Sequence, residues 1–187
     1  MKKKRSFLEL AQARKSVHEF TDQNVKEGDL KKIFEAARLS PSANNSQQWS
    51  FIIIKNKKTI ESLMNSCHYG FFHTAPPLLV AVVLEPLDKH FQGMLKHQAK
   101  EVTEYHHYLN ISQPVAAMVY EAEDLGIGSC ILSPIMEITN KLLKVPQGKT
   151  IPLLVGFGYE KKGAFQLNLR RKNMKNLLFS ENYGGKR

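Results

Sequence analysis

Apolar residues recur along this chain at two spacings, one typical of helices and the other typical of strands. Spacing of three and four residues predicts helices at 6–13, 27–39, 57–66, 113–125 and from 134 or 135 to 143. Apolar and β-branched runs predict strands at 51–55, 78–84, 129–132 and 151–159. The run at 78–84 is apolar throughout, which is typical of a strand buried on both faces. Helices and strands interleave, so the pattern indicates an α+β protein or a three-layer α/β sheet protein.

The remaining stretches carry weaker signals. Residues 89–109 are polar and rich in histidine, and we expect them to be helical, whereas residues 164–187 show no clear period. Gly126 follows the helix predicted at 113–125 and is expected to end it. No internal repeat or linker divides the 187 residues. We therefore expect one domain over 1–187, with flexible ends at 1–5 and about 181–187.

Neither a membrane span nor a secretion signal is visible in the sequence. The longest apolar run, from Ala75 to Leu84, has ten residues including two prolines, whereas a span needs about 20. The basic start of the chain lacks the apolar stretch of a signal peptide. Cys67 and Cys130 lie 63 positions apart without metal-type spacing around them. We expect a cytoplasmic protein with reduced thiols, no bound metal and no membrane partner.

The net charge of +10 is concentrated at the two ends of the chain. Residues 1–5 carry four basic side chains and no acidic one, and residues 161–187 carry eight basic and one acidic. Residues 6–160 carry 15 basic and 16 acidic side chains and are close to neutral. Nucleic-acid binders usually spread their cations over one face, so this distribution disfavours a nucleic-acid partner. Binding of nucleic acid or of an acidic partner through the two ends stays open as an alternative.

Two basic clusters could hold the phosphate group of a small ligand. The first, Arg14-Lys15-Ser16, ends the first predicted helix and offers a forked donor pair, a point charge and a hydroxyl. Its cations could instead only offset the helix dipole. The second cluster, residues 170–172, lies near the other end of the chain and consists of two arginines and a lysine.

The loop from Pro41 to Trp49 is rich in side chains that form hydrogen bonds. Six of its nine residues are Ser, Asn or Gln, and the only tryptophan of the chain ends it. Such a loop between a helix and a buried strand could recognise a polar heterocycle or a sugar alcohol. The alternative is an ordinary connection in which these residues form turns.

The segment from Gly126 to Cys130 combines small residues that would let the backbone approach a flat ligand. It is not a dinucleotide fingerprint, because it follows a helix and lacks the third glycine. We interpret Cys130 as a buried, inert thiol rather than a nucleophile. His97, His106 and His107 could bind a metal, although a solvated helix face explains them better. No acid, base and nucleophile trio stands out, so an enzyme of this sequence would take its electron chemistry from a cofactor.

Taken in order, these segments resemble the nitroreductase family of FMN-dependent oxidoreductases, over about residues 6–180. Residues 14–18 resemble the family's Arg-(Arg/Lys/His)-Ser-x-Arg element, and residues 41–49 its Pro-Ser-x-x-Asn-x-Gln-Pro-Trp loop. Residues 125–130 match the pattern Leu-Gly-Leu-Gly-Ser/Thr-Cys, and residues 156–159 lie where the family has a strand ending in Gly-Tyr. Residues 171–173 lie where the family has Arg-Lys-Pro. The chain departs from these motifs at three positions, with His18 in place of arginine and Gln48 and Asn173 in place of proline.

The resemblance implies a three-layer α-β-α fold with a central, mostly antiparallel sheet, in a domain-swapped homodimer. It implies that FMN phosphate and ribityl are held by Arg14, Lys15, Ser16, His18 and Arg171, with Arg170 as the alternative to Arg171. It also implies that a loop reaches the flavin bound mainly to the partner subunit, through Pro41, Ser42, Ala43, Asn44 and Gln47. A backbone N–H near the end of the strand at 129–132 would face flavin N5, which adds Ser133, Pro134 and Met136 as candidates. No side chain is given a catalytic role.

The implied activity is hydride transfer from NADH or NADPH to flavin N5, followed by reduction of a small, flat acceptor such as a nitroaromatic or quinone. The two half-reactions would alternate in one pocket, so ping-pong kinetics are expected. The region 85–110 is short and matches nothing distinctive. The same fold with divergent flavin chemistry, such as dehalogenation, azoline oxidation or flavin processing, is therefore the alternative function.

Overall fold

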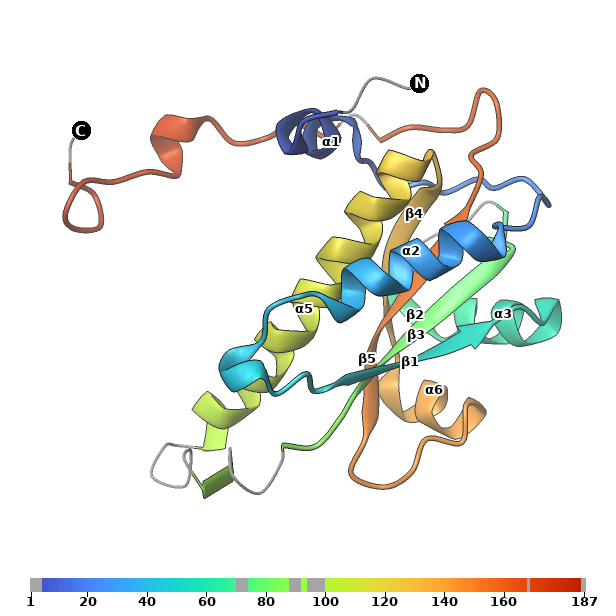
Figure 1. Ribbon diagram of the computed structural model, residues 1–187, viewed down its shortest axis with the longest axis horizontal. Coiled ribbons are helices and arrows are strands. Elements are labelled where there is room, and N and C mark those ends of the chain that lie inside the picture. The colour runs from blue at the N-terminus through green and yellow to red at the C-terminus, as the bar shows by residue number, and fades with distance from the viewer. Residues whose placement is uncertain (1–4, 70–73, 88–91, 94–99, 168, 186–187) are drawn as a thin grey trace.

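The computed structural model describes residues 5–69, 74–87, 92–93, 100–167 and 169–185, and a five-stranded sheet forms its middle layer (Figure 1). The strands are β1 (Trp49–Ile54), β2 (Cys67–Tyr69), β3 (Leu78–Leu84), β4 (Gly128–Pro134) and β5 (Thr150–Gly158). Their order across the sheet is β1-β3-β5-β4-β2, and each neighbouring pair is antiparallel. The predicted antiparallel central sheet is confirmed.

Helices cover both faces of this sheet (Figure 1). They are α1 (Phe7–Ala13), α2 (Glu27–Arg38), α3 (Lys57–Met64), α5 (Lys100–Leu125) and α6 (Met136–Leu142), with short 3-10 turns η1 (Ala43–Asn45) and η2 (Met174–Asn176). One core lies between the sheet and helices α2 and α5, where Ile33 and Met118 are fully buried. The other core lies on the opposite face, where Ile60 and Leu63 of α3 pack. The layers are therefore α-β-α, as predicted.

Strand β3 divides its side chains between the two cores, because successive residues of a strand point to opposite faces. Val80 and Val82 belong to the core beneath α2 and α5, whereas Leu79 and Ala81 belong to the core beneath α3. All seven residues of β3 are buried. The prediction of a strand buried on both faces is confirmed, with the predicted bounds.

The structure differs from the sequence prediction at α5 and β2. Helix α5 is one helix of 26 residues and contains Pro114, whereas the sequence suggested two separate segments. Pro114 cannot donate to the carbonyl of Asn110, but buried Ile111 and Val115 on either side of it keep the helix packed on the sheet. Strand β2 was not predicted, because three residues are too few to show a period. Residues 89–91 and 94–99, part of the stretch predicted to be helical, lie outside the described residues.

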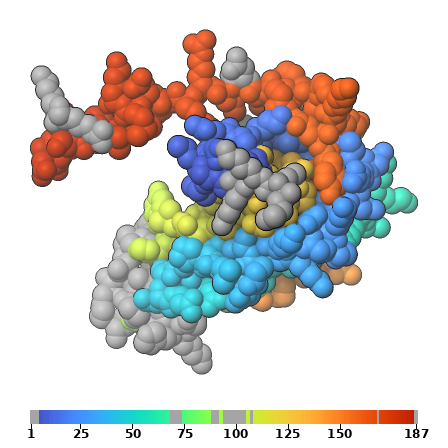
Figure 2. All heavy atoms as spheres, turned by 45° about the horizontal axis from the view of Figure 1, so that its top comes forward, coloured from blue at the N-terminus to red at the C-terminus, as the bar shows by residue number. Residues whose placement is uncertain are grey.

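Both ends of the described chain lie along the same side of the molecule (Figure 1). Ser6 caps α1, accepting from the Glu9 N–H at 3.2 Å and donating its own N–H to the Glu9 carboxylate at 2.6 Å. Arg5, at the predicted flexible N-terminal end, pairs with Glu123 of α5 at 3.1 Å. From η2 onward, the described tail up to residue 185 extends away from the body of the molecule (Figure 2). None of the helices in the described ranges is both long enough and apolar enough to span a membrane.

Candidate functional site

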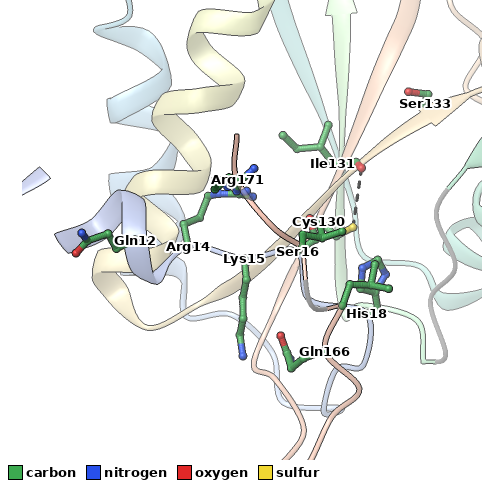
Figure 3. Close-up of a pocket in the computed structure, with 12 residues that line it drawn as sticks. Gln12, Arg14, Lys15, Ser16, His18, Cys130, Ile131, Ser133, Gln166 and Arg171 are labelled. Carbon is green, nitrogen blue, oxygen red and sulfur yellow. Dashed lines mark hydrogen bonds between the residues drawn. The ribbon is translucent and has the colours of Figure 1, made fainter. Parts of the chain in front are cut away.

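A pocket of about 500 Å³ lies between the segment that follows α1, strand β4 and the C-terminal tail (Figure 3). Its predicted members are Arg14, Lys15, Ser16, His18, Ser133 and Arg171. Its other lining residues are Gln12, Cys130, Ile131, Gln166, Leu167 and Leu169. Two segments separated by most of the sequence therefore meet around one cavity.

The segment after α1 is held in place by the edge of the sheet. The Val17 N–H donates to the Ser129 carbonyl at 2.9 Å, and Ser16 forms a bridge with Ser129. Val17 is buried against Gly128, where an added Cβ would lie 2.7 Å from the Val17 side chain. Because side chains alternate along an extended segment, Ser16 and His18 then point to the other side, toward the pocket.

Arg14 and Arg171 both line the pocket and give it positive charge (Figure 3). Neither guanidinium forms an ion pair with any residue in the described ranges. Arg14 directly follows α1 and donates its N–H to the Leu10 carbonyl at 2.9 Å, which sets the direction of its backbone. Two guanidinium groups that form no ion pair within the described part of the chain are a suitable site for an anion such as phosphate.

The charge of Lys15 is shared with an acidic neighbour. Lys15 Nζ lies 2.9 Å from a carboxylate oxygen of Glu160, which follows β5. The other Glu160 oxygen accepts a hydrogen bond from the side-chain amide of Gln166, another residue that lines the pocket. Glu160 reaches this place because Phe20 and Glu160 form an antiparallel bridge. Lys15 is therefore less available to an anion than Arg14 or Arg171.

Cys130 lines the pocket as a protonated thiol. Burial raises its pKa to about 11, although a hydrogen bond from Ser16 and the charge of Arg14 act in the opposite direction. Burial likewise raises the pKa of Cys67 to about 11. The structure confirms that Cys130 is buried, and since the thiolate is the reactive form, the raised pKa favours the interpretation of Cys130 as an unreactive thiol.

The amide-rich loop does not reach this pocket of the same chain. Residues 43–45 form η1 at the end of α5 opposite α1 (Figure 1), and none of the loop candidates lines the pocket: Pro41, Ser42, Ala43, Asn44 and Gln47. The Ala43 N–H donates to the side chain of Asn110 in α5 at 3.0 Å. The structure thus separates the loop candidates from the basic candidates.

Two further candidates lie beside the pocket without lining it. Pro134 is the buried last residue of β4, and Met136 begins α6 with its side chain exposed. Sequence reasoning did not single out several residues that line the pocket: Gln12, Ile131, Gln166, Leu167 and Leu169. The alternation of Phe165, Leu167 and Leu169 was an available signal for an extended segment with one apolar side.

The histidines do not form a metal site in the part of the chain that the structure describes. That part contains no group of three side chains able to hold a metal ion. His97 and the side chain of His107 lie outside it, and His106 is half-buried on α5.

This chain is similar in sequence to proteins described as nitroreductases. Residues 11–77 match the model of the Nitroreductase family. A provisionally named NADH dehydrogenase/NAD(P)H nitroreductase of Archaeoglobus fulgidus is 27% identical over 160 residues, covering 82% of this chain and 85% of that protein.

Solved structures share the fold. A nitroreductase family protein of Streptococcus pneumoniae superposes with a TM-score of 0.81 at 22% identity, over 94% of this chain and 100% of the other. A Clostridium difficile protein described as an FMN-dependent nitroreductase has a TM-score of 0.65 at 23% identity, over 88% of this chain and 98% of the other. At these identities the structural matches establish the fold.

Proposed function

We propose that this chain is a member of the nitroreductase family and an FMN-dependent oxidoreductase that uses NADH or NADPH to reduce small, flat acceptors such as nitroaromatics or quinones. The proposal treats residues 1–187 as one FMN-binding domain that acts in the cytoplasm. The free thiols of Cys67 and Cys130 are consistent with a reducing compartment.

The meeting of Arg14 and Arg171 in one pocket carries this proposal. Two guanidinium groups without ion-pair partners in the described ranges, with the Ser16 hydroxyl beside them, match the donors that a phosphate monoester requires. The cavity of about 500 Å³ is within the range of cofactor sites. The residues present therefore fit the phosphate end of FMN.

When bound, FMN would supply hydride acceptance and release at its N5 position. The chain's own residues would bind and orient it. Arg14 and Arg171 would hold the phosphate, and Ser16 and His18 would face the ribityl chain from the segment bridged to β4. The backbone donor to N5 would be the N–H of Ser133 or Met136, because Pro134 has no N–H and the Ile135 N–H is already bonded to the Ser66 carbonyl at 2.7 Å.

The proposed assembly is a homodimer in which the loop at 41–47 reaches the flavin of the partner subunit. Two observations support it. The loop lies away from the pocket of its own subunit (Figure 1). Beyond Arg171, which lines the pocket, the tail extends away from the body and carries exposed apolar side chains, among them Leu177 and Phe179 (Figure 2). Exposed apolar surface of this kind is typical of a segment that packs on another chain.

The visible absorbance spectrum of freshly purified protein, recorded before and after adding NADPH without oxygen, tests the proposed chemistry. We expect flavin bands that bleach on NADPH addition and return when menadione is added. Sedimentation of the same material should show a flavin-loaded dimer. Colourless protein that does not bind added FMN at micromolar concentration would refute the proposal, and flavin without NAD(P)H turnover would favour divergent flavin chemistry.

A further inference from the structure

We propose that Asn110 is a positioning residue that, together with Gln48, holds the loop at 42–47 in the shape needed to contact flavin. The inference rests on the proposed function, because it assumes that this loop contacts FMN. Asn110 lies in α5 and Gln48 directly precedes β1, so the two residues come from different layers of the fold.

The loop has an unusual backbone that needs support. Asn44, Asn45 and Gln47 have φ angles of 50°, 54° and 44°, all in the left-handed region. Asparagine tolerates this region better than most residues, and glutamine does so less well. Within the loop, the Gln47 N–H donates to the Ser42 hydroxyl at 3.0 Å, and the Asn45 N–H donates to the Ser42 carbonyl at 3.0 Å. These short-range bonds define the turn but do not attach it to the rest of the protein.

The side chain of Asn110 attaches both ends of the loop to α5. Its oxygen accepts from the Ala43 N–H at 3.0 Å, near the start of the loop. Its nitrogen donates to the side-chain oxygen of Gln48 at 3.2 Å, directly after the loop. Asn110 is 7% exposed and Gln48 is 2% exposed, so both hydrogen bonds are shielded from water. The Asn110 amide therefore ties both ends of the loop to a long helix.

Gln48 is itself anchored, so the connection is stiff. Its carbonyl accepts from the Glu85 N–H at 3.1 Å, just beyond the end of β3. In the nitroreductase motif that residues 41–49 resemble, proline stands at the position of Gln48, and its ring would restrict the backbone. In this chain the Gln48–Asn110 pair supplies the restriction instead. The loop is then presented with Asn44 and Gln47 exposed at the surface of the subunit.

A second asparagine offers a matched control. Asn140 of α6 uses the same two kinds of bond: its oxygen accepts from the Ile151 N–H at 2.9 Å, and its nitrogen donates to the Thr150 hydroxyl at 3.0 Å. It holds the start of β5, outside the loop and outside the residues that line the basic pocket. Asn110→Ala and Asn140→Ala therefore remove equivalent bonds at different places.

The test measures FMN affinity and thermal unfolding separately for protein stripped of flavin. We expect Asn110→Ala to raise the FMN dissociation constant about tenfold or more, as for loss of a pre-organising hydrogen-bonded contact, and to change the visible circular dichroism of bound flavin. Asn140→Ala should lower the melting temperature of the stripped protein about as much as Asn110→Ala does, but it should change neither the FMN affinity nor the circular dichroism spectrum of bound flavin. The double variant Asn110→Leu with Gln48→Met keeps side chains of similar shape but removes the hydrogen bonds of Asn110 to Ala43 and Gln48. The stripped protein should therefore stay folded while its FMN affinity falls.

Two results would overturn the inference. One is unchanged FMN affinity in both Asn110→Ala and the folded double variant. The other is an equal loss of FMN affinity in Asn140→Ala, which would show a general effect of lowered stability. If the wild-type chain binds no FMN, the proposed function fails, and this inference fails with it.

Discussion

Replacing Arg14 or Arg171 by alanine should weaken the binding of FMN far more than the binding of riboflavin, which has no phosphate. Both guanidinium groups line the same pocket, and neither has an ion-pair partner in the described ranges. Each can make charge-assisted hydrogen bonds worth about 1.5–3 kcal/mol, so each loss should raise the FMN dissociation constant about 10- to 150-fold. Riboflavin affinity should change little. The double variant should lose less free energy than the sum of the single variants, because both groups would share one phosphate.

Fluorescence titration of flavin-stripped protein with FMN and with riboflavin measures these changes. Arg38→Ala is a suitable control, because Arg38 is exposed on α2 and pairs only locally, with Glu35 at 2.7 Å. Its flavin affinities should equal those of the wild type. The phosphate assignment is wrong if Arg14→Ala and Arg171→Ala bind FMN normally. It is also wrong if they lose FMN and riboflavin affinity equally, since damage to the whole pocket would produce that result.

Three other substitutions test the packing at the end of β5, the charge of Lys15 and the protonation of Cys130. Gly158→Ala would place a Cβ 2.6 Å from the Pro77 ring, so denaturant unfolding should show a loss of about 1–3 kcal/mol. Glu160→Gln should tighten FMN binding about two- to fivefold in titrations at low salt, because it releases Lys15, and high salt should reduce the gain. The raised pKa of Cys130, about 11, should stabilise the fold below pH 9, and this stabilisation should be lost as the pH rises toward 11. Cys130→Ser should make that part of the pH–stability profile less steep, while Cys67, whose pKa is also raised to about 11, keeps part of the slope. A Cys130 that alkylates rapidly at neutral pH would contradict the assignment.

The sequence predicted the layers of the fold well because its core elements carry strong local patterns. Strand β3 is apolar at every position, and α2 places Leu30, Ile33 and Ala37 on one buried face. Such patterns reflect burial directly, so they can be recognised without knowledge of the rest of the chain. Strand β2 has only three residues and forms because β4 offers it a free edge, so its existence depends on tertiary pairing.

The site was less predictable, because its geometry depends on contacts between distant segments. The basic clusters were visible as residue types, and the resemblance linked Arg14 to Arg171 across most of the chain. Nothing in the sequence indicated that Glu160 would pair with Lys15, since that contact requires the bridge between Phe20 and Glu160. Asn110 gave no local signal either: a polar residue in a helix usually faces water, and only the fold shows it buried against the loop.

The separation of the loop from the basic pocket has a thermodynamic consequence for the proposed dimer. If the loop of one subunit contacts the flavin of the other, each bound FMN bridges two chains. FMN then binds the dimer more tightly than the single chain, and by linkage it must tighten the dimer by the same factor. The Asn110–Gln48 pair belongs to this coupling, because it lowers the entropy that the loop would lose on meeting the flavin of the partner. In the proposed dimer, flavin affinity and subunit association would therefore be two expressions of one interaction, in which a rigid helix presents the loop of one chain to the cofactor held by the arginines of the other.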